Sequence, residues 1–263
     1  MHSTNNVILE AKGIQKAFGG VMAVAGIDLT IRRGEIFALI GPNGAGKTTV
    51  FNLISGTHAL DRGEITFNGR AIHGMPTHKT AALGLVRTFQ NLQIFNGMTV
   101  LENVMVGRHL RARAGFLAAA LRLPGVAAEE RRTRERARVF LEKVGLAARA
   151  DDPADSLPYG QQRLLEIARA LAAEPHLLML DEPAAGLNRA ETEALDALIE
   201  RIRADGITVL LVEHDMNLVM GIADRIAVLH YGSKIAEGTP AEAQADERVI
   251  EAYLGADWAV DHA

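Results

Sequence analysis

The chain has 263 residues, of which 48% are hydrophobic and 23% charged, and its 28 basic and 32 acidic residues give a formal net charge of −4. Such a chain can bury the core of one large domain or two small ones, and its composition excludes global disorder and collagen-like or coiled-coil proteins. The lack of cysteine excludes disulfides, thiol catalysis and zinc held by cysteine, and it fits a reducing cytosol. The negative charge argues against nucleic acid as the main ligand.

Two kinds of strand pattern are present. Short apolar and polar alternations at residues 7–9 and 22–31 predict antiparallel strands. Residues 64–67 followed by Asn68-Gly69 predict a hairpin, because this dipeptide accepts the positive φ angles of a tight turn. Continuous apolar runs instead predict strands covered on both faces, as in a parallel sheet flanked by helices. These runs lie at residues 36–40, 177–180, 207–212 and 226–229, and helical patterns lie at residues 47–55, 161–173 and 190–204.

Residues 100–150 have a different composition, rich in Ala and Arg and without a strand pattern. We interpret this region as a helical insertion within the α/β core. Several arginines gather between residues 131 and 138, interleaved with glutamates. The interleaving favours a solvated helix face, and the alternative is contact with a partner or with anionic lipid headgroups.

A glycine-rich motif directly follows the first buried run. The glycines allow successive backbone N–H groups to converge on phosphate oxygens, and the helix that follows directs its positive end there. Lys47 is expected to neutralise the β- and γ-phosphates and Thr48 to ligate Mg²⁺, with Thr49 beside them. Because strand, loop and helix are in register, the motif predicts a nucleotide site and not merely a glycine-rich turn. It reads Gly41-Pro42-Asn43-Gly44-Ala45-Gly46-Lys47-Thr48, which fits G-x-x-x-x-G-K-[ST].

A pair of carboxylates follows the buried run at residues 177–180. That strand delivers Asp181 to its carboxyl end, beside the phosphate loop, where the carboxylate can hold the Mg²⁺ shell. Glu182 is then placed to accept a proton from water that attacks the γ-phosphate. Two adjacent carboxylates can also cap a helix, but that alternative leaves the phosphate loop without a metal partner.

The order of the motifs resembles the ATP-binding subunit of ABC transporters over nearly the whole chain. That family carries a phosphate loop, a Gln, the signature L-S-G-G-Q, an Asp-Glu pair and a switch His. The resemblance implies that Gln90 links the Mg²⁺ and water site to the helical insertion, that His214 contacts the γ-phosphate, and that Phe18 stacks on adenine. Taken singly, a Phe is more often a core residue and a His a satisfied polar group. The signature matches Leu157-Pro158-Tyr159-Gly160-Gln161, of which Tyr159, Gly160 and Gln161 are expected to contact nucleotide.

The same resemblance implies the fold and the division of the chain. We expect an α/β P-loop NTPase of the RecA-like kind, as a single nucleotide-binding domain over residues 1–263. The parallel-sheet core and an N-terminal antiparallel β subdomain would occupy residues 7–91 and 157–240. An inserted α-helical subdomain would occupy residues 92–156, and a C-terminal helical tail residues 241–263.

The residues of several motifs narrow the resemblance to importers of branched-chain amino acids, which use two ATPase subunits. Urea and short-amide importers share many of these motif residues, and the lipopolysaccharide-export ATPase shares fewer of them. In such systems the membrane subunits and a periplasmic binding protein choose the substrate. The motifs are Arg87-Thr88-Phe89-Gln90, Tyr159-Gly160-Gln161-Gln162-Arg163, Ala184-Ala185-Gly186-Leu187-Asn188, Glu213-His214-Asp215-Met216 and Tyr253-Leu254-Gly255.

The chain departs from the family pattern at two places. Pro158 replaces the signature serine, whose hydroxyl helps to hold the γ-phosphate of ATP on the facing subunit and caps the next helix. We therefore expect weakened closure with retained hydrolysis, and Ser156 is a candidate substitute cap. Asn188 and Arg189 replace the family's usual Asp and Pro in the loop between subunits, which leaves the hydrolytic residues untouched.

The resemblance implies a cycle in which MgATP is sandwiched between two ATP-binding subunits, identical or paralogous, and hydrolysis drives transmembrane permease subunits. No secretory signal and no apolar run of about 18 residues is visible. We expect peripheral attachment to the cytoplasmic face of the inner membrane. Three rival interpretations fit less well: a soluble ABC ATPase acting on translation or DNA, a catalytically inactive ATP-binding regulator, and a P-loop small-molecule kinase.

Overall fold

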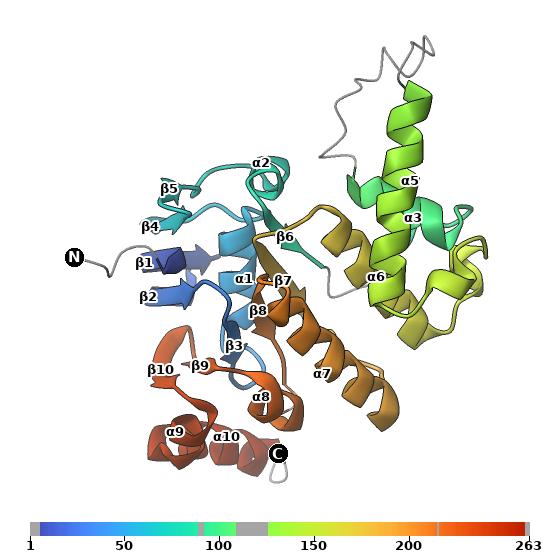
Figure 1. The fold of residues 1–263 in the computed structure, drawn as a ribbon. Helices are drawn as coiled ribbons and strands as arrows, with labels where there is room; N and C mark the ends of the chain where they lie inside the picture. The colour runs from blue at the N-terminus through green and yellow to red at the C-terminus, as the bar shows by residue number, and fades with distance from the viewer. Residues whose placement is uncertain (1–5, 89–91, 109–125, 215, 261–263) are drawn as a thin grey trace.

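The computed structural model describes residues 6–88, 92–108, 126–214 and 216–260. The strands of these residues form a four-stranded antiparallel sheet and a six-stranded mixed sheet, with helices packed around them (Figure 1). The predicted α/β class with a parallel-sheet core and an antiparallel β portion is therefore confirmed.

The antiparallel sheet has the order β2-β1-β4-β5. Its turn between β4 and β5 uses Asn68 and Gly69, whose φ angles are 52° and 74°. Phe67 lies opposite Arg70 across this turn, so the predicted hairpin is confirmed. The strands are β1 (Val7–Phe18), β2 (Val21–Arg32), β4 (Arg62–Phe67) and β5 (Arg70–Ala71).

The larger sheet has the order β10-β9-β3-β8-β7-β6. The pairs among β9, β3, β8, β7 and β6 are parallel, and β10 pairs antiparallel with β9. The four predicted buried runs are β3, β7, β8 and β9, whereas the sequence patterns missed β6 and β10. The strands are β3 (Ile36–Ile40), β6 (Leu85–Arg87), β7 (Leu177–Asp181), β8 (Thr208–Val212), β9 (Arg225–His230) and β10 (Ser233–Gly238).

The larger sheet is buried on both faces, which explains its continuous apolar strands. In β3, Phe37 and Leu39 join one apolar cluster with residues of β1, β2 and the helix α1 (Lys47–Ser55). Ile36, Ala38 and Ile40 point to the other face, into a cluster filled by the remaining helices. The strand is fixed in register because a slip by one residue would exchange its two faces.

Helix α1 lies on the side of the antiparallel sheet, whereas residues of α3 and of α5 to α10 fill the cluster on the other face. In Figure 1, α3 and α5 project to one side, and α9 and α10 lie below β10. No helix among the described residues is long and apolar enough to cross a membrane. These helices are α2 (Thr77–Ala82), α3 (Val100–Gly107), α5 (Val126–Lys143), α6 (Tyr159–Ala172), α7 (Arg189–Ala204), α8 (Met216–Ile222), α9 (Pro240–Ala245) and α10 (Glu247–Val260).

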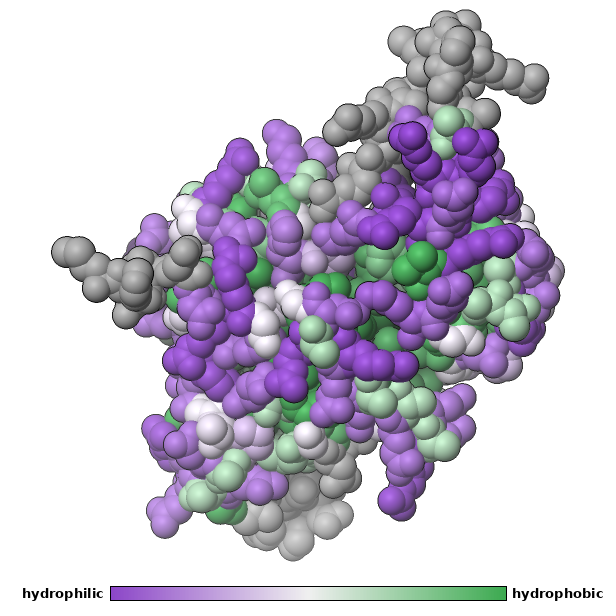
Figure 2. Space-filling model, viewed as in Figure 1, coloured by the Kyte–Doolittle hydropathy of each residue, from purple (hydrophilic) through white to green (hydrophobic). Residues whose placement is uncertain are grey.

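The arginine cluster lies on α5, over which hydrophilic side chains crowd (Figure 2). Arg134 pairs with Glu130 at 3.2 Å, one helical turn away, and Arg136 pairs with Glu174 at 2.7 Å. Arg131 and Arg138 are exposed. Exposed pairs of this kind agree with the interpretation of this face as a solvated one.

Candidate functional site

The candidate site lies at the carboxyl edge of the larger sheet. β3, β8 and β7 are parallel neighbours in that order, so their carboxyl ends meet at one edge. The glycine-rich loop follows β3, Asp181 and Glu182 lie at the end of β7, and His214 follows β8. Residues far apart in the sequence are thereby brought together, as expected for ligand sites in parallel sheets.

The phosphate loop requires glycine at two positions by close approach. A Cβ atom on Gly41, whose φ is 147°, would lie 2.1 Å from the Leu229 carbonyl oxygen. One on Gly46, whose φ is 102°, would lie 2.5 Å from the Ala23 carbonyl oxygen. Gly46 begins α1 without a side-chain cap, and no acidic residue lies in the first turn. The N–H groups at this helix start therefore remain open to an anion.

Lys47 bridges the loop. Its buried Nζ donates to the carbonyl oxygens of Gly41 at 2.6 Å and Pro42 at 3.0 Å. Burial lowers the pKa of Lys47, and the nearby charges of Glu182 and Asp181 oppose that shift. The ammonium group is thus hydrogen-bonded to the loop and attracted by the two carboxylates, and a phosphate group bound there would find a counter-charge.

Asp181 is the most unusual charge of the site. Its side chain is 1% exposed, and neither carboxylate oxygen accepts a hydrogen bond from the described residues. Burial raises the pKa of Asp181 to about 6, although the charge of Arg87 acts in the opposite direction. A buried carboxylate that lacks donors fits a cation ligand, and the exposed Thr48 hydroxyl is the second protein ligand expected for Mg²⁺.

The described residues hold no group of three or more His, Cys, Asp or Glu side chains that could form a metal site by themselves. The fit of Mg²⁺ to this edge rests on the unpartnered oxygens of Asp181.

Glu182 and His214 face each other beside the phosphate loop. The φ angle of Glu182 is 47°, in a region that non-glycine residues rarely occupy and that often marks functional sites. His214 Nδ1 lies 3.8 Å from Glu182 Oε2 and is 61% exposed. The structure therefore brings the predicted base and the predicted switch histidine together, with His214 open to a ligand.

The predicted signature residues begin α6. Pro158 is the N-cap, and no side chain caps this helix. The Ser156 hydroxyl donates to the Pro153 carbonyl oxygen at 2.7 Å, so the expectation that Ser156 could serve as the substitute cap is wrong. A Cβ atom on Gly160 would lie 2.4 Å from Glu191 Oε1, so a larger residue there would displace the end of the Glu191 side chain. The uncapped start of α6, with Tyr159 and Gln161, is open to an anion from outside this chain.

Two further candidate residues have contacts of their own. Phe18, 44% exposed at the end of β1, packs edge-on against His58 with ring centroids 5.4 Å apart. Asn188 caps α7 in a reciprocal capping box with Glu191, so it serves a structural role there. Gln90 lies outside the described residues.

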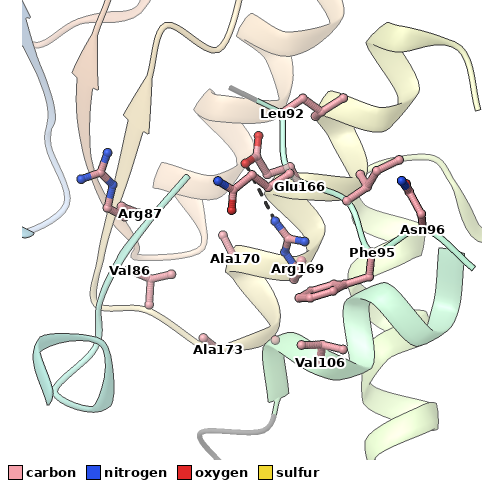
Figure 3. Close-up of a pocket in the computed structure, with 13 residues that line it drawn as sticks. Val86, Arg87, Leu92, Phe95, Asn96, Val106, Glu166, Arg169, Ala170 and Ala173 are labelled. Atoms are coloured by element: carbon pink, nitrogen blue, oxygen red, sulfur yellow. Dashed lines mark ion pairs between the residues drawn. The ribbon is translucent and has the colours of Figure 1, made fainter. Parts of the chain in front are cut away.

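A groove of about 610 Å³ lies between β6 and the helices α3 and α6. It adjoins the carboxyl edge of the larger sheet, where the candidate site lies; we call this edge the nucleotide edge. Arg169 of α6 stacks over the Phe95 ring at 5.3 Å, and Glu166 lies 3.9 Å from Arg169 (Figure 3). Leu92 and Ile94 line the wall that follows Gln90 in the chain. The groove is therefore lined by residues 92–96, which follow Gln90 in the chain, and by α6, the helix that starts with the signature.

Three residues near the site carry no role in the sequence interpretation. Glu213 is fully buried and accepts from the Ala184 N–H at 2.8 Å, which ties the loop after Glu182 to β8. Arg163 donates to Tyr159 Oη at 3.1 Å and pairs with the buried Glu166. Arg87 lies 3.6 Å from Asp181. Each of these residues belongs to a motif that carries the family resemblance, and membership of that motif was the only indication of a role in the sequence.

Comparison with known families matches residues 24–185 to the family model described as ABC transporter. This span includes the phosphate loop, the signature and Asp181. The chain belongs to the ABC transporter family. Its residues 233–259 also match the model of a branched-chain amino acid ATP-binding cassette transporter.

The chain is similar to proteins and structures of ABC transporters along almost its whole length. It is 47% identical to the high-affinity branched-chain amino acid transport ATP-binding protein BraF of Pseudomonas aeruginosa, over 94% of this chain and 98% of the relative. An ATP-binding cassette in its ADP conformation superposes with a TM-score of 0.82, at 32% identity over 95% and 99% of the two chains. A dimeric bacterial ABC transporter cassette gives 0.75, at 26% identity over 89% and 99%. As an ABC ATPase, the chain binds and hydrolyses ATP.

The buried charge of Asp181 predicts opposite effects on stability and binding. Because the folded pKa is raised, the ionised carboxylate costs stability above about pH 6, and that cost shrinks as the pH falls toward the unfolded value. Asp181→Asn should therefore raise the free energy of unfolding in urea at neutral pH, by about 1–3 kcal/mol. The gain should fall by roughly half near pH 5. Mg²⁺-dependent ATP binding should be lost, and a less stable variant at neutral pH would contradict this account.

Proposed function

We propose that the chain is the ATP-hydrolysing subunit of an importer of branched-chain amino acids, attached to the cytoplasmic face of the membrane through its permease subunits. The observation that carries hydrolysis is the meeting of Lys47, Asp181, Glu182 and His214 at one sheet edge. The substrate class rests on the match of residues 233–259 and on the likeness to BraF.

The chemistry assigned to the chain is positioning and proton transfer. The open N–H groups at the start of α1 and the ammonium group of Lys47 hold the phosphates. Glu182 accepts the proton of the attacking water, and His214, whose exposed ring faces Glu182, contacts the γ-phosphate. A bound Mg²⁺, held by Asp181 and Thr48, would balance the charge of the β- and γ-phosphate oxygens.

We further propose that a second ATP-binding subunit completes each site. The start of α6 is uncapped and supplies Tyr159, Gly160 and Gln161 toward the facing subunit's nucleotide. Pro158 offers neither a hydroxyl nor an N–H to that phosphate, so closure is weaker than with serine. Two like subunits held by nucleotide agree with the dimeric cassette to which this chain is similar.

The groove is the proposed seat of a permease segment. It combines an apolar wall with the stacked Arg169 and Phe95 and the buried Glu166, so an amphipathic helix with a polar tip would suit it (Figure 3). β6 and the second half of α6 both line it, so movement of the segment would reach the site through these two elements.

Glu182→Gln tests the proposed base. Without a proton acceptor the variant should bind MgATP but lose at least a hundredfold in turnover, within the range expected for a general base. The trapped nucleotide should hold two subunits together, which light scattering detects as an ATP-dependent dimer. Lys47→Ala, expected to weaken nucleotide binding itself, is the matched comparison. Normal turnover in Glu182→Gln would remove Glu182 from this role.

Pro158→Ser tests the proposed weakening of closure. The restored hydroxyl can cap α6 and reach the facing phosphate, so the ATP concentration at half-maximal dimerisation should fall, by about 2–10-fold for a cap of typical strength. Sedimentation velocity across an ATP titration measures this. Ser156→Ala, which leaves the helix start unchanged, should not move the midpoint. Equal midpoints for Pro158→Ser and the wild type would reject the role given to Pro158.

The substrate is tested in the assembled transporter. The chain, its permease subunits and the cognate binding protein are reconstituted in lipid vesicles, and ATPase is measured with each candidate ligand. Leucine, isoleucine and valine should stimulate turnover several-fold through the binding protein. Stimulation by urea or short amides alone would replace the substrate assignment while keeping the ATPase one. A chain that sediments with ribosomes or DNA instead of membranes would contradict transport altogether.

A further inference from the structure

Arg87 lies at the boundary between the groove and the nucleotide edge. It is the last residue of β6, and the strand beside it forms part of the groove wall. Its side chain points away from the groove residues, toward the opposite side of the strand (Figure 3). The guanidinium is 13% exposed, so its neighbours are protein atoms.

One half of the guanidinium is fastened to α1, the helix that begins at the phosphate loop. Arg87 Nη1 donates to Asn52 Oδ1 at 2.7 Å, to Ser55 Oγ at 3.0 Å and to Thr57 Oγ1 at 3.1 Å. The same group lies over the Phe51 ring, 4.8 Å from its centroid. Asn52 and Ser55 lie at the C-terminal end of α1 and Thr57 follows the helix, so these contacts join the end of β6 to that end of α1.

The other half reaches the carboxylate assigned to magnesium. Arg87 Nη2 lies 3.6 Å from Asp181 Oδ2, too far for a hydrogen bond but close enough for strong electrostatic attraction. β6 and β7 are also joined directly, because the Thr88 N–H donates to the Met179 carbonyl oxygen at 2.9 Å. Since the two Asp181 oxygens accept no hydrogen bond from the described residues, Arg87 is a principal constraint on where that carboxylate sits.

We propose that Arg87 is a positioning residue that ties the Asp181 carboxylate to the phosphate helix α1 and thereby sets how strongly Mg²⁺ promotes nucleotide binding. The inference rests on the proposed function of Asp181. The planar, forked guanidinium suits this task because its two nitrogens face different partners at fixed angles. A lysine would keep the charge but could not face α1 and Asp181 together.

Arg87 also links the groove to the magnesium side of the site. β6 itself lines the groove through Val86 and Arg87, so a segment seated in the groove bears on the strand that carries Arg87. Because the guanidinium is anchored on α1 and attracted to Asp181, displacement of β6 is transmitted to the magnesium side of the site. If the Arg87 side chain only filled space, its replacement would not selectively change the effect of Mg²⁺ on nucleotide affinity.

The test measures the affinity of the full chain for a non-hydrolysable ATP analogue, with Mg²⁺ and with EDTA, by calorimetry. The ratio of the two affinities is the gain due to Mg²⁺. Arg87→Gln should reduce this gain about tenfold, at the lower end of the range for residues that support a metal ligand. Its affinity in EDTA should stay near that of the wild type. Arg87→Lys should lose part of the gain.

Two further variants separate positioning from folding. Asn52→Ala removes one anchor on α1 and leaves the charge beside Asp181, so it should lower the gain by a smaller factor. Arg203 of α7 forms a partly exposed ion pair with Asp224, and neither residue contacts Asp181. Arg203→Gln breaks this pair and should leave the gain due to Mg²⁺ unchanged. All variants are compared by thermal unfolding.

An unchanged or increased gain in Arg87→Gln overturns the inference. Equal losses with Mg²⁺ and with EDTA also overturn it, because they would show a general structural role. A wild-type chain whose affinity does not depend on Mg²⁺ would instead contradict the function proposed for Asp181, and with it this inference.

Discussion

The parallel alignment of β3, β8 and β7 is the constraint on which the rest of the site depends. It sends the phosphate loop, the residues after β8 and the Asp181-Glu182 pair to a single edge. Both faces of these strands are buried, so hydrophobic packing fixes their register. The site is therefore held in place by apolar contacts beneath it, while its own charged groups remain free to serve the nucleotide.

Those charged groups are arranged to receive a ligand. Asp181 is buried without a hydrogen-bond donor among the described residues, Lys47 is held against carbonyl oxygens, and Glu182 adopts a positive φ angle. The buried carboxylate of Asp181 and the positive φ angle of Glu182 cost free energy that nucleotide and metal can recover. Such local cost is common at functional sites, and the large apolar clusters on either side of the sheet offset it.

The groove and the nucleotide edge share short structural elements. β6 separates them, with Arg87 directed to the nucleotide side, and α6 runs from the signature to the groove through Arg163, Glu166 and Arg169. Ion pairs buried this deeply are sensitive to displacement because an unpaired buried charge is expensive. These shared elements are the short path through which the proposed coupling between the two sites would run.

The sequence by itself determined the buried strands, the Asn68-Gly69 hairpin, the main helices and the motif residues, because these depend on local periodicity and on residues adjacent in the chain. It did not indicate β6, which has three residues, or the half-buried β10. Only the tertiary structure decided that Glu213 binds the Ala184 N–H, 29 positions away, and that Arg87 reaches Asn52, 35 positions away. Such contacts form when packed elements bring distant side chains together, and no local pattern encodes them.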